Sequence, residues 1–302
     1  NGKGITLDAN LRLTDDSVKG SFNYNHPNFK YSDRALSTSL DITETDKLSD
    51  FGYKSSLNSI SLGTSYEQFE STFFSPKFLI SNESLETTSD ASEAYRKQEG
   101  SYFDSSFAYG LNFDRRNSAY QPTSGFYSSW YQQLPIISEN QTIINGYIIT
   151  GYKELVDDMI ISTGIYTRAV NSLSNDDVRV SRRLYVPSSR LRGFESGKVG
   201  PKDGDDHVGG NYIVTFNTSS TIPFILQTQE NMDLKLFFDA GNVWGVDYSS
   251  TIDDSNTIRT STGLALEITT PVGPLSFSFA QVLSKASTDK TESFKFQLGT
   301  TF

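Results

Sequence analysis

The sequence predicts an all-β protein, a membrane-spanning antiparallel β-barrel. Apolar and polar residues alternate with period 2 in about fifteen segments, many near the ~9–11 residues that a tilted strand needs to cross a bilayer. No helical periodicity of comparable length interrupts these segments. An open sheet of so many strands would have exposed edges, and closure into a barrel removes them.

The first segment, residues 5–13, shows the alternation without a break. One face carries Ile5, Leu7, Ala9, Leu11 and Leu13, and the other carries Thr6, Asp8, Asn10 and Arg12. Period 2 indicates a strand with one apolar and one polar face. Taken alone, this segment fits a half-buried strand of a soluble sandwich better than a membrane strand.

The same alternation returns along the whole chain, and the repetition favours the barrel. The further apolar positions are Phe22 and Tyr24; Leu36, Leu40 and Ile42; Ile60, Leu62 and Tyr66; Phe107, Tyr109, Leu111 and Phe113; Phe126, Trp130 and Leu134; Tyr147 and Ile149; Ile161, Ile165 and Ala169; residues 212–216, 234–238 and 264–268; and Phe277 and Phe279.

The last segment, residues 292–302, predicts a closing strand. Phe294, Phe296, Leu298, Thr300 and Phe302 share one face. An aromatic residue at a strand end is typical of the membrane interface.

The connections differ in length. We expect short turns at 14–17, 48–52 and 135–140, and long polar links at 81–100 and 189–210. Short turns on one rim and long loops on the other are typical of outer-membrane barrels. No linker divides the chain, so we expect one domain over residues 1–302.

Composition excludes several functions. A net charge of −10 argues against nucleic acid as a partner, and the absence of cysteine excludes disulfides and thiolate metal sites. A mean hydropathy of −0.41 does not separate a soluble β-protein from a membrane barrel, because barrel strands alternate. No segment approaches the ~18 apolar residues of a membrane helix.

The sequence offers no catalytic, cofactor or metal site. His26 and His207 are the only histidines, both in expected loops, and neither lies near a triad-like arrangement. A calcium site at Asp203, Asp205 and Asp206, or at Asp253 and Asp254, is conceivable, but a solvated loop is the commoner explanation of such a run. We therefore predict that the chain is not an enzyme.

A loop rich in Arg and Gly, residues 189–195, lies between two strand segments and needs an anionic partner. We predict that Arg192 docks against Asp239 inside the barrel. On a surface such a pair contributes about 0–1 kcal/mol, but shielded from water, losing one partner costs about 3–5 kcal/mol. Gly193 would allow a close turn, and Phe194 would pack the loop against the wall.

These residues carry a resemblance to a known family. Leu191-Arg192-Gly193-Phe194 is similar to a lid-loop signature of the BamA family of outer-membrane assembly factors. That family belongs to the superfamily of outer-membrane assembly and translocation barrels, of bacterial surface antigen type. The other matching motifs are Gly200-Pro201-Lys202, Gly209-Gly210-Asn211, residues 238–244 with Asp239 and Gly241, residues 259–263 and 271–277, and Arg116 with Pro122-Thr123-Ser124-Gly125.

The resemblance implies a sixteen-strand barrel with the lid loop, at about residues 187–210, folded inward. It implies that the family's first strand and its POTRA domains lie upstream of Asn1, so that about fifteen strands are present here. The lid arginine of the family also meets a glutamate, and the matching position here is Ser219, so only Asp239 is carried over.

The function implied is the folding and insertion of client β-barrels through a lateral seam between the first and last strands. The implied location is the outer membrane of a Gram-negative bacterium. The implied partners are unfolded outer-membrane proteins, accessory lipoproteins of the BAM complex, periplasmic chaperones acting through the POTRA domains, and the lipid bilayer. The alternatives are a two-partner secretion or autotransporter-assembly pore of the same superfamily, and a passive porin, against which the lid loop argues.

Overall fold

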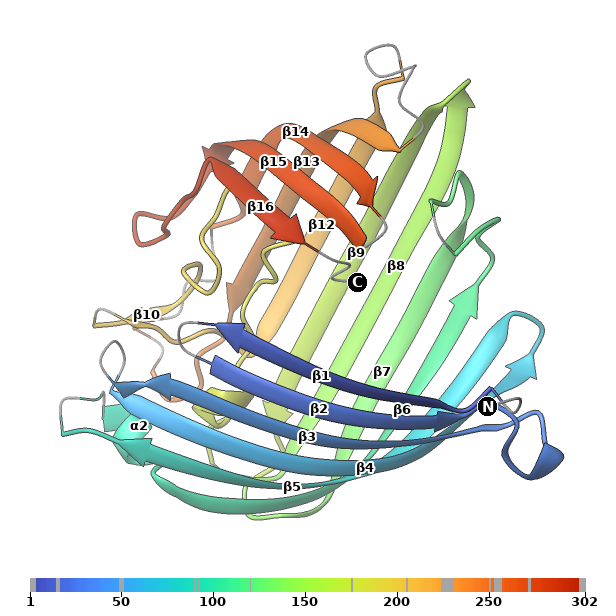
Figure 1. Cartoon of the computed structure of the whole chain (residues 1–302). Coiled ribbons are helices and arrows are strands. Elements are labelled where there is room, and N and C mark those ends of the chain that lie inside the picture. Colours follow the sequence, from blue (N-terminus) through green and yellow to red (C-terminus); the bar gives the residue numbers. More distant parts are fainter. Residues whose placement is uncertain are drawn as a thin grey trace. The chain divides into compact units, whose positions relative to one another are not determined.

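The fold consists almost entirely of antiparallel strands in the computed structural model of the chain (Figure 1). The structure describes residues 4–14, 17–48, 52–89, 91, 93–119, 121–174, 176–204, 206–223, 231–249, 251–252, 257–270 and 273–298. The chain divides into two compact units, residues 1–113, 129–145 and 170–183, and residues 114–128, 146–169 and 184–302. We call them unit 1 and unit 2.

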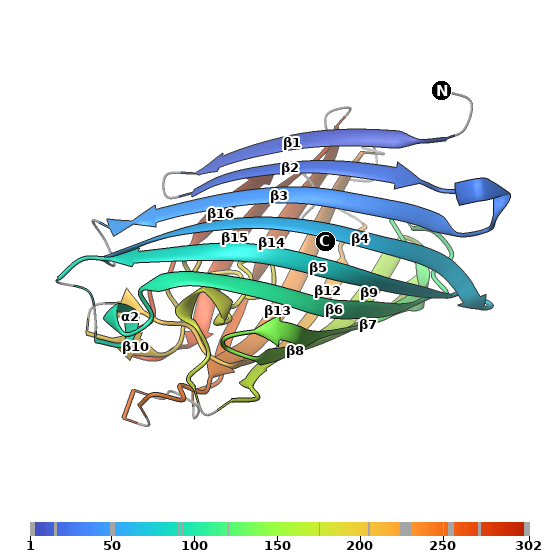
Figure 2. The same ribbon diagram turned by 90° about the horizontal axis from the view of Figure 1, so that it is seen from below.

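Unit 1 begins with a meander of long strands. Its elements are β1 (Thr6–Thr14), β2 (Ser17–His26), the 3-10 turn η1 (Phe29–Tyr31), β3 (Ala35–Lys47), β4 (Tyr53–Phe69), β5 (Thr72–Thr87), the short helix α2 (Glu93–Arg96), β6 (Gly100–Asp114) and the 3-10 turn η2 (Val180–Arg182). Each strand from β1 to β5 pairs antiparallel with the next, so that the last of these pairs is β5–β6. Figures 1 and 2 show β1 to β5 running side by side.

Besides β6, whose last residue Asp114 falls in unit 2, three strands contribute residues to both units: β7 (Ser124–Ser138), β8 (Thr142–Val156) and β9 (Met159–Ser172). The remaining strands, all in unit 2, are β10 (Lys202–Asp203), β11 (Asp206–His207), β12 (Tyr212–Thr221), β13 (Met232–Trp244), β14 (Arg259–Thr270), β15 (Gly273–Ser284) and β16 (Phe294–Leu298). In unit 2 the strand order is β9-β12-β13-β14-β15-β16, and each of these neighbours pairs antiparallel. Strands β10 and β11 form a separate two-stranded ribbon.

The expected alternation holds, and its apolar face is the exposed one. In unit 1, Leu7, Leu40 and Phe78 are 63%, 47% and 57% exposed. In unit 2 a row across four paired strands, Leu236, Leu264, Phe279 and Phe294, is likewise exposed. Exposed apolar side chains on successive strands are what a lipid-facing wall requires, and a soluble sandwich would bury them.

Several predicted boundaries were wrong. Residues 81–87 belong to β5, so the long link between β5 and β6 covers only residues 88–99. This stretch looks like a loop because its inward face is polar, and Glu83 is buried against an arginine of the same unit. The turn expected at 135–140 is shorter, because β7 continues to Ser138. His26 is the last residue of β2 and not a loop residue.

Within the described residues, sixteen strand elements are present, fourteen of them in the main sheet and two in the ribbon. No helix in this part of the chain is long and apolar enough to cross a membrane.

Candidate functional site

The candidate site is the loop between β9 and β12, which we call the lid. It covers residues 173–211 and is longer than the predicted 187–210, because β9 ends at Ser172 and β12 begins at Tyr212. Its first part, to Arg183, belongs to unit 1 and the rest to unit 2.

In unit 2 the predicted pair of Arg192 and Asp239 is formed. Arg192 donates from Nε to Oδ2 of Asp239 at 2.7 Å and from Nη2 to Oδ1 at 2.8 Å, and its backbone N–H donates to Oδ2 at 3.1 Å. The Asp239 side chain is fully buried and that of Arg192 is 17% exposed. The guanidinium also lies over the ring of Phe237, 3.5 Å from its centroid. A two-pronged, buried contact of this kind fixes geometry as well as charge.

Asn217, not Ser219, is the strand β12 residue that joins this pair. Asn217 lies directly opposite Asp239 in the β12–β13 register, and its Nδ2 donates to Oδ1 of Asp239 at 2.8 Å and to the Arg190 carbonyl at 2.7 Å. Ser219 lies opposite Phe237 and bonds to Ser162 at 2.8 Å. The sequence did not show that Asn217 faces Asp239, because the register of β12 against β13 could not be read from it.

Gly193 has the conformation that the turn requires. Its φ is +92°, and a Cβ there would lie 3.1 Å from Cβ of Ala280 and 3.2 Å from Cγ2 of Val282. The lid backbone therefore lies directly against β14 and β15, and Ser261 on β14 donates from Oγ to the Arg192 carbonyl at 2.5 Å. Only glycine meets both demands without strain.

The other predicted lid residues occupy the same unit. Leu191 and Phe194 are both 2% exposed, so the lid buries both of these apolar side chains. The glycines of the two downstream motifs and of strand β13 lie where the backbone closely approaches a neighbour. A Cβ added at Gly200 would lie 2.4 Å from Val243, and one at Gly209 would lie 2.6 Å from the Leu184 carbonyl. At Gly210 it would lie 2.4 Å from the Trp244 carbonyl, and at Gly241 3.0 Å from Thr215. Pro201 accepts the backbone N–H of Val208 at 3.0 Å.

A second buried ion pair in unit 2 was missed. Arg259, at the start of β14, donates from Nε and Nη2 to Asp289 at 2.9 and 3.0 Å, and both side chains are fully buried. Nη1 of Arg259 donates to Asn242 on β13. Arg259 was noted only as part of a strand motif, and Asp289 lies in a polar turn that carries no sequence signal.

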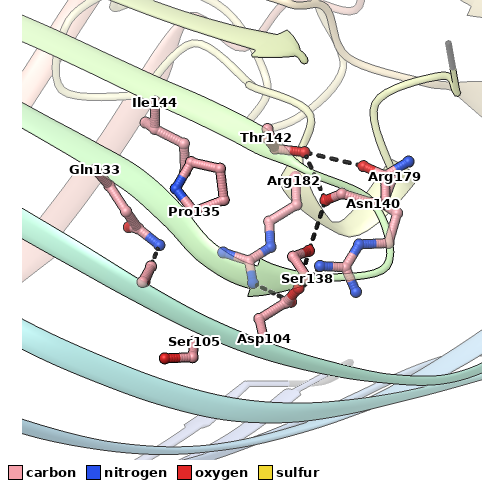
Figure 3. A pocket seen from close by; sticks show the side chains of 11 residues that line it. Asp104, Ser105, Gln133, Pro135, Ser138, Asn140, Thr142, Ile144, Arg179 and Arg182 are labelled. Atoms are coloured by element: carbon pink, nitrogen blue, oxygen red, sulfur yellow. Dashed lines mark hydrogen bonds and ion pairs between the residues drawn. The ribbon is translucent and has the colours of Figure 1, made fainter. Parts of the chain in front are cut away.

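Unit 1 holds the other end of the lid through arginines as well (Figure 3). Arg179 pairs with Asp104 on β6 and, from Nη1, with Glu83 on β5 at 3.2 Å, and all three side chains are at least nine-tenths buried. Arg182 adds a contact to Asp104 at 2.9 Å. A cavity of about 20 Å³ beside them has room for one water molecule. The sequence signal that could have found this cluster is the basic run Arg179, Arg182 and Arg183 within a chain of net negative charge.

Within the described residues, the predicted closing strand is present as β16, over Phe294–Leu298. Phe294 and Phe296 are 48% and 51% exposed, and they stack beside Phe279 and Phe277 of β15 with centroid distances of 5.0 and 5.1 Å. The backbone of Leu298 pairs with Leu275. Phe302 lies outside the described residues.

No metal-binding group of three or more His, Cys, Asp or Glu side chains occurs in the described ranges. Asp203 accepts a hydrogen bond from the Tyr248 hydroxyl at 3.2 Å. Asp205, Asp253 and Asp254 lie outside the described part of the chain.

Comparisons with known proteins fit this geometry. The model of the Omp85 superfamily domain matches residues 1–302. The chain is 25% identical over 218 residues to Outer membrane protein assembly factor BamA of Neorickettsia risticii, a match that covers 70% of this chain and 29% of that protein. It is also similar to the crystal structure of BamA from Haemophilus ducreyi lacking POTRA domains 1–3, at 25% identity and a TM-score of 0.86, covering 98% of this chain and 64% of that one.

CdiB from Acinetobacter baumannii is similar at a TM-score of 0.53 and 11% identity over 97% of this chain, a likeness of fold alone. The likeness to the H. ducreyi protein confirms the predicted fold class, an antiparallel membrane-spanning β-barrel. The chain spans under a third of the length of the N. risticii protein and under two thirds of the H. ducreyi chain.

Proposed function

Because the chain belongs to the Omp85 superfamily, we propose that it is the barrel domain of an outer-membrane β-barrel assembly factor of the BamA type. The observation that carries the proposal is the lid held by Arg192 and Asp239 within this fold. A passive pore has no use for a loop docked on the inner wall by a buried ion pair. The N. risticii relative is named an outer membrane protein assembly factor, which agrees with the prediction that the chain is not an enzyme.

The mechanism we propose is strand addition at a weak seam. A client strand that reaches an open sheet edge gains main-chain hydrogen bonds, and in hydrocarbon each unpaired backbone group costs several kcal/mol. In the described residues, β16 is the last strand in the order of the main sheet, where it pairs with β15. This place at the end of the strand order supports the seam at β16.

The partners follow from the same proposal. They are unfolded outer-membrane proteins as clients, the accessory lipoproteins of the assembly complex, and periplasmic chaperones that act through POTRA domains in the full-length protein. The location is the outer membrane of a Gram-negative bacterium, where the exposed apolar wall meets lipid. Hydrophobic mismatch between this wall and the bilayer would also thin the membrane locally.

The test is a reversible lock on the seam of the full-length protein, reconstituted in vesicles with an unfolded outer-membrane protein as client. The lock pairs F296C in β16 with a cysteine at the facing position of the first strand. The matched control is F277C with F296C, which ties β16 to its register partner on β15 and leaves the seam free. The described chain has no cysteine of its own to interfere.

We expect the seam lock to abolish client folding under oxidising conditions, with recovery on reduction, and the control to remain active. Normal client folding with the seam locked would contradict the mechanism. Export of a partner exoprotein by vesicles that fold no client would instead indicate a secretion pore, and large steady currents across a planar bilayer would indicate a porin.

A further inference from the structure

The loop between β15 and β16 is joined to the lid by its backbone. Phe194 and Thr291 form an antiparallel bridge. Around it, the N–H of Glu195 donates to the Lys290 carbonyl at 3.1 Å, and the N–H of Glu292 donates to the Gly193 carbonyl at 3.1 Å. Further along, the N–H of Lys290 donates to the Lys198 carbonyl at 3.1 Å. The lid and this loop therefore form a short stretch of sheet that ends where β16 begins.

Asp289 is the point where three segments meet. Its carboxylate accepts Nε and Nη2 of Arg259 from β14, the Gly200 N–H from the lid at 3.2 Å, and the Ala286 N–H from its own loop at 2.6 Å. One residue earlier, the Thr288 carbonyl lies 3.1 Å from Nε2 of His207, a lid residue that is 3% exposed.

A fully buried ion pair is a poor way to gain stability alone, because apolar side chains of the same volume do as well or better. What this pair supplies is specificity. The four N–H groups that donate to Asp289 come from β14, the lid and the loop before β16, and these three segments fit together in one arrangement only. Removing either charge leaves the other buried without its partner, so the arrangement is held strongly once formed.

We propose that Arg259 and Asp289 are positioning residues for the closing strand, and that they couple its position to docking of the lid. Only residues 290–293 separate Asp289 from Phe294, the first residue of β16. With Asp289 held, β16 is fixed at its Phe294 end and detaches from its Leu298 end first. The interpretation of β16 detachment as opening of the seam rests on the proposed function, whereas the coupling between the lid and β16 does not.

The experiment measures backbone hydrogen exchange of the full-length protein in lipid nanodiscs, without client, in two segments: residues 193–200 of the lid and residues 290–298. The test variants are D289N and R259K, and R192A tests whether lid release alone reaches β16. The control is K235Q, which removes one charge from the Lys235–Glu267 pair between β13 and β14.

We expect D289N to speed exchange in both segments at least about tenfold, R259K to act in the same direction, and R192A to speed exchange in residues 290–298 as well. K235Q leaves both segments unchanged. Within β16 of the wild-type protein, residues 297–298 exchange before residues 294–295.

Rescue separates positioning from general loss of stability. Glu195 and Lys290 are neighbours beside the Phe194–Thr291 bridge, and antiparallel neighbours lie within the range that a disulfide spans. Adding E195C and K290C to D289N restores slow exchange of residues 290–298 when oxidised and loses it when reduced. If D289N does not fold, R259K carries the same comparison.

Wild-type exchange rates in D289N and R259K would overturn the coupling, whatever the wild-type protein does to clients. Fast exchange in D289N that the oxidised disulfide fails to slow would overturn it as well. Failure of the wild-type protein to fold clients would refute the proposed function and leave the exchange result standing.

Discussion

Replacing Arg192 with alanine should release the lid from Asp239 on β13. In the wild-type structure, Asp239 accepts four hydrogen bonds: three from Arg192, of which one is from its backbone, and one from Asn217. The R192A change removes the two side-chain bonds and the contact with the Phe237 ring, and leaves the buried carboxylate with two neutral donors.

Removing one partner of a buried pair costs about 3–5 kcal/mol. The guanidinium is 17% exposed and the carboxylate keeps two donors, so the lower end applies, about 3 kcal/mol. Loss of the ring contact adds about 1 kcal/mol. At about 1.4 kcal/mol per tenfold, the undocked lid becomes about 10²- to 10³-fold more populated.

The assay is limited proteolysis of the lid in the folded, membrane-embedded protein, together with hydrogen exchange of residues 187–200. R192K should give an intermediate result, because it keeps the charge and loses the two-pronged geometry. The R192A/D239N double variant should be less damaging than the sum of the single changes, since each single change leaves a buried group unpaired. Protease resistance and exchange of R192A at wild-type levels would refute the reasoning.

Three further predictions concern neighbouring groups. G193A should make the free energy of lid docking less favourable by about 1–3 kcal/mol. G197A should have a smaller effect, because Gly197 is also at positive φ but its Cβ would have no neighbour closer than 4.0 Å. Equal effects of the two variants on proteolysis would contradict the packing argument. Burial lowers the pKa of His207; Lys198 and Lys202 lower it further, whereas the Thr288 carbonyl and Asp289 oppose the shift. The undocked state therefore binds the proton more readily, and lid docking should weaken as pH falls below about 6.5. H207Q should remove this pH dependence in exchange measurements between pH 5 and 8, and a dependence that persists in H207Q would belong to another group. R179A should lower the thermal unfolding temperature in a heat-modifiability assay, with partial recovery in R179A/D104N, because Asp104 then no longer carries a buried charge; an unchanged R179A would mean that Arg182 alone suffices.

The strands could be predicted because period 2 is local. Leu7, Leu11 and Leu13 needed no partner to be recognised as one face, and the exposure of that face is what the barrel prediction requires. Arg192 and Asp239 could be paired because the lid signature and the acidic strand motif are both recognisable and each occurs once in the sequence. The prediction gave the two residues but not the geometry, and Gly193 with its positive φ followed from the same motif.

What could not be predicted depends on register and on distant contacts. Asn217 and Ser219 have the same polarity and the same facing, so only the pairing with β13 tells which lies beside Asp239. Asp104 and Arg179 are far apart in sequence, and Asp289 is one acid among many in a chain with 36 Asp and Glu residues. Residues 81–87 were taken for a loop because a polar inward face looks like solvent exposure until its ionic partner is known.

The arginine pairs follow from the inverted polarity of the wall. Because the outward faces of the strands are apolar, the inward faces carry the polar side chains, and a loop that docks there meets carboxylates such as Asp239 and Asp104. In both units the lid supplies the arginine and a strand supplies the acid. If the lid were apolar, docking would bury the carboxylates of the wall without partners. The free energy that this burial costs exceeds the stabilisation gained by burying the apolar lid. The lid is therefore held by a few strong and specific contacts.

If so, single charge-removing changes should release the lid, whereas trimming Leu191 to alanine should loosen it without changing which residues pair. Loss of both anchors on removal of Leu191 alone, seen as full exchange of the whole lid in L191A, would show that apolar packing holds the lid and that the ion pairs only follow it.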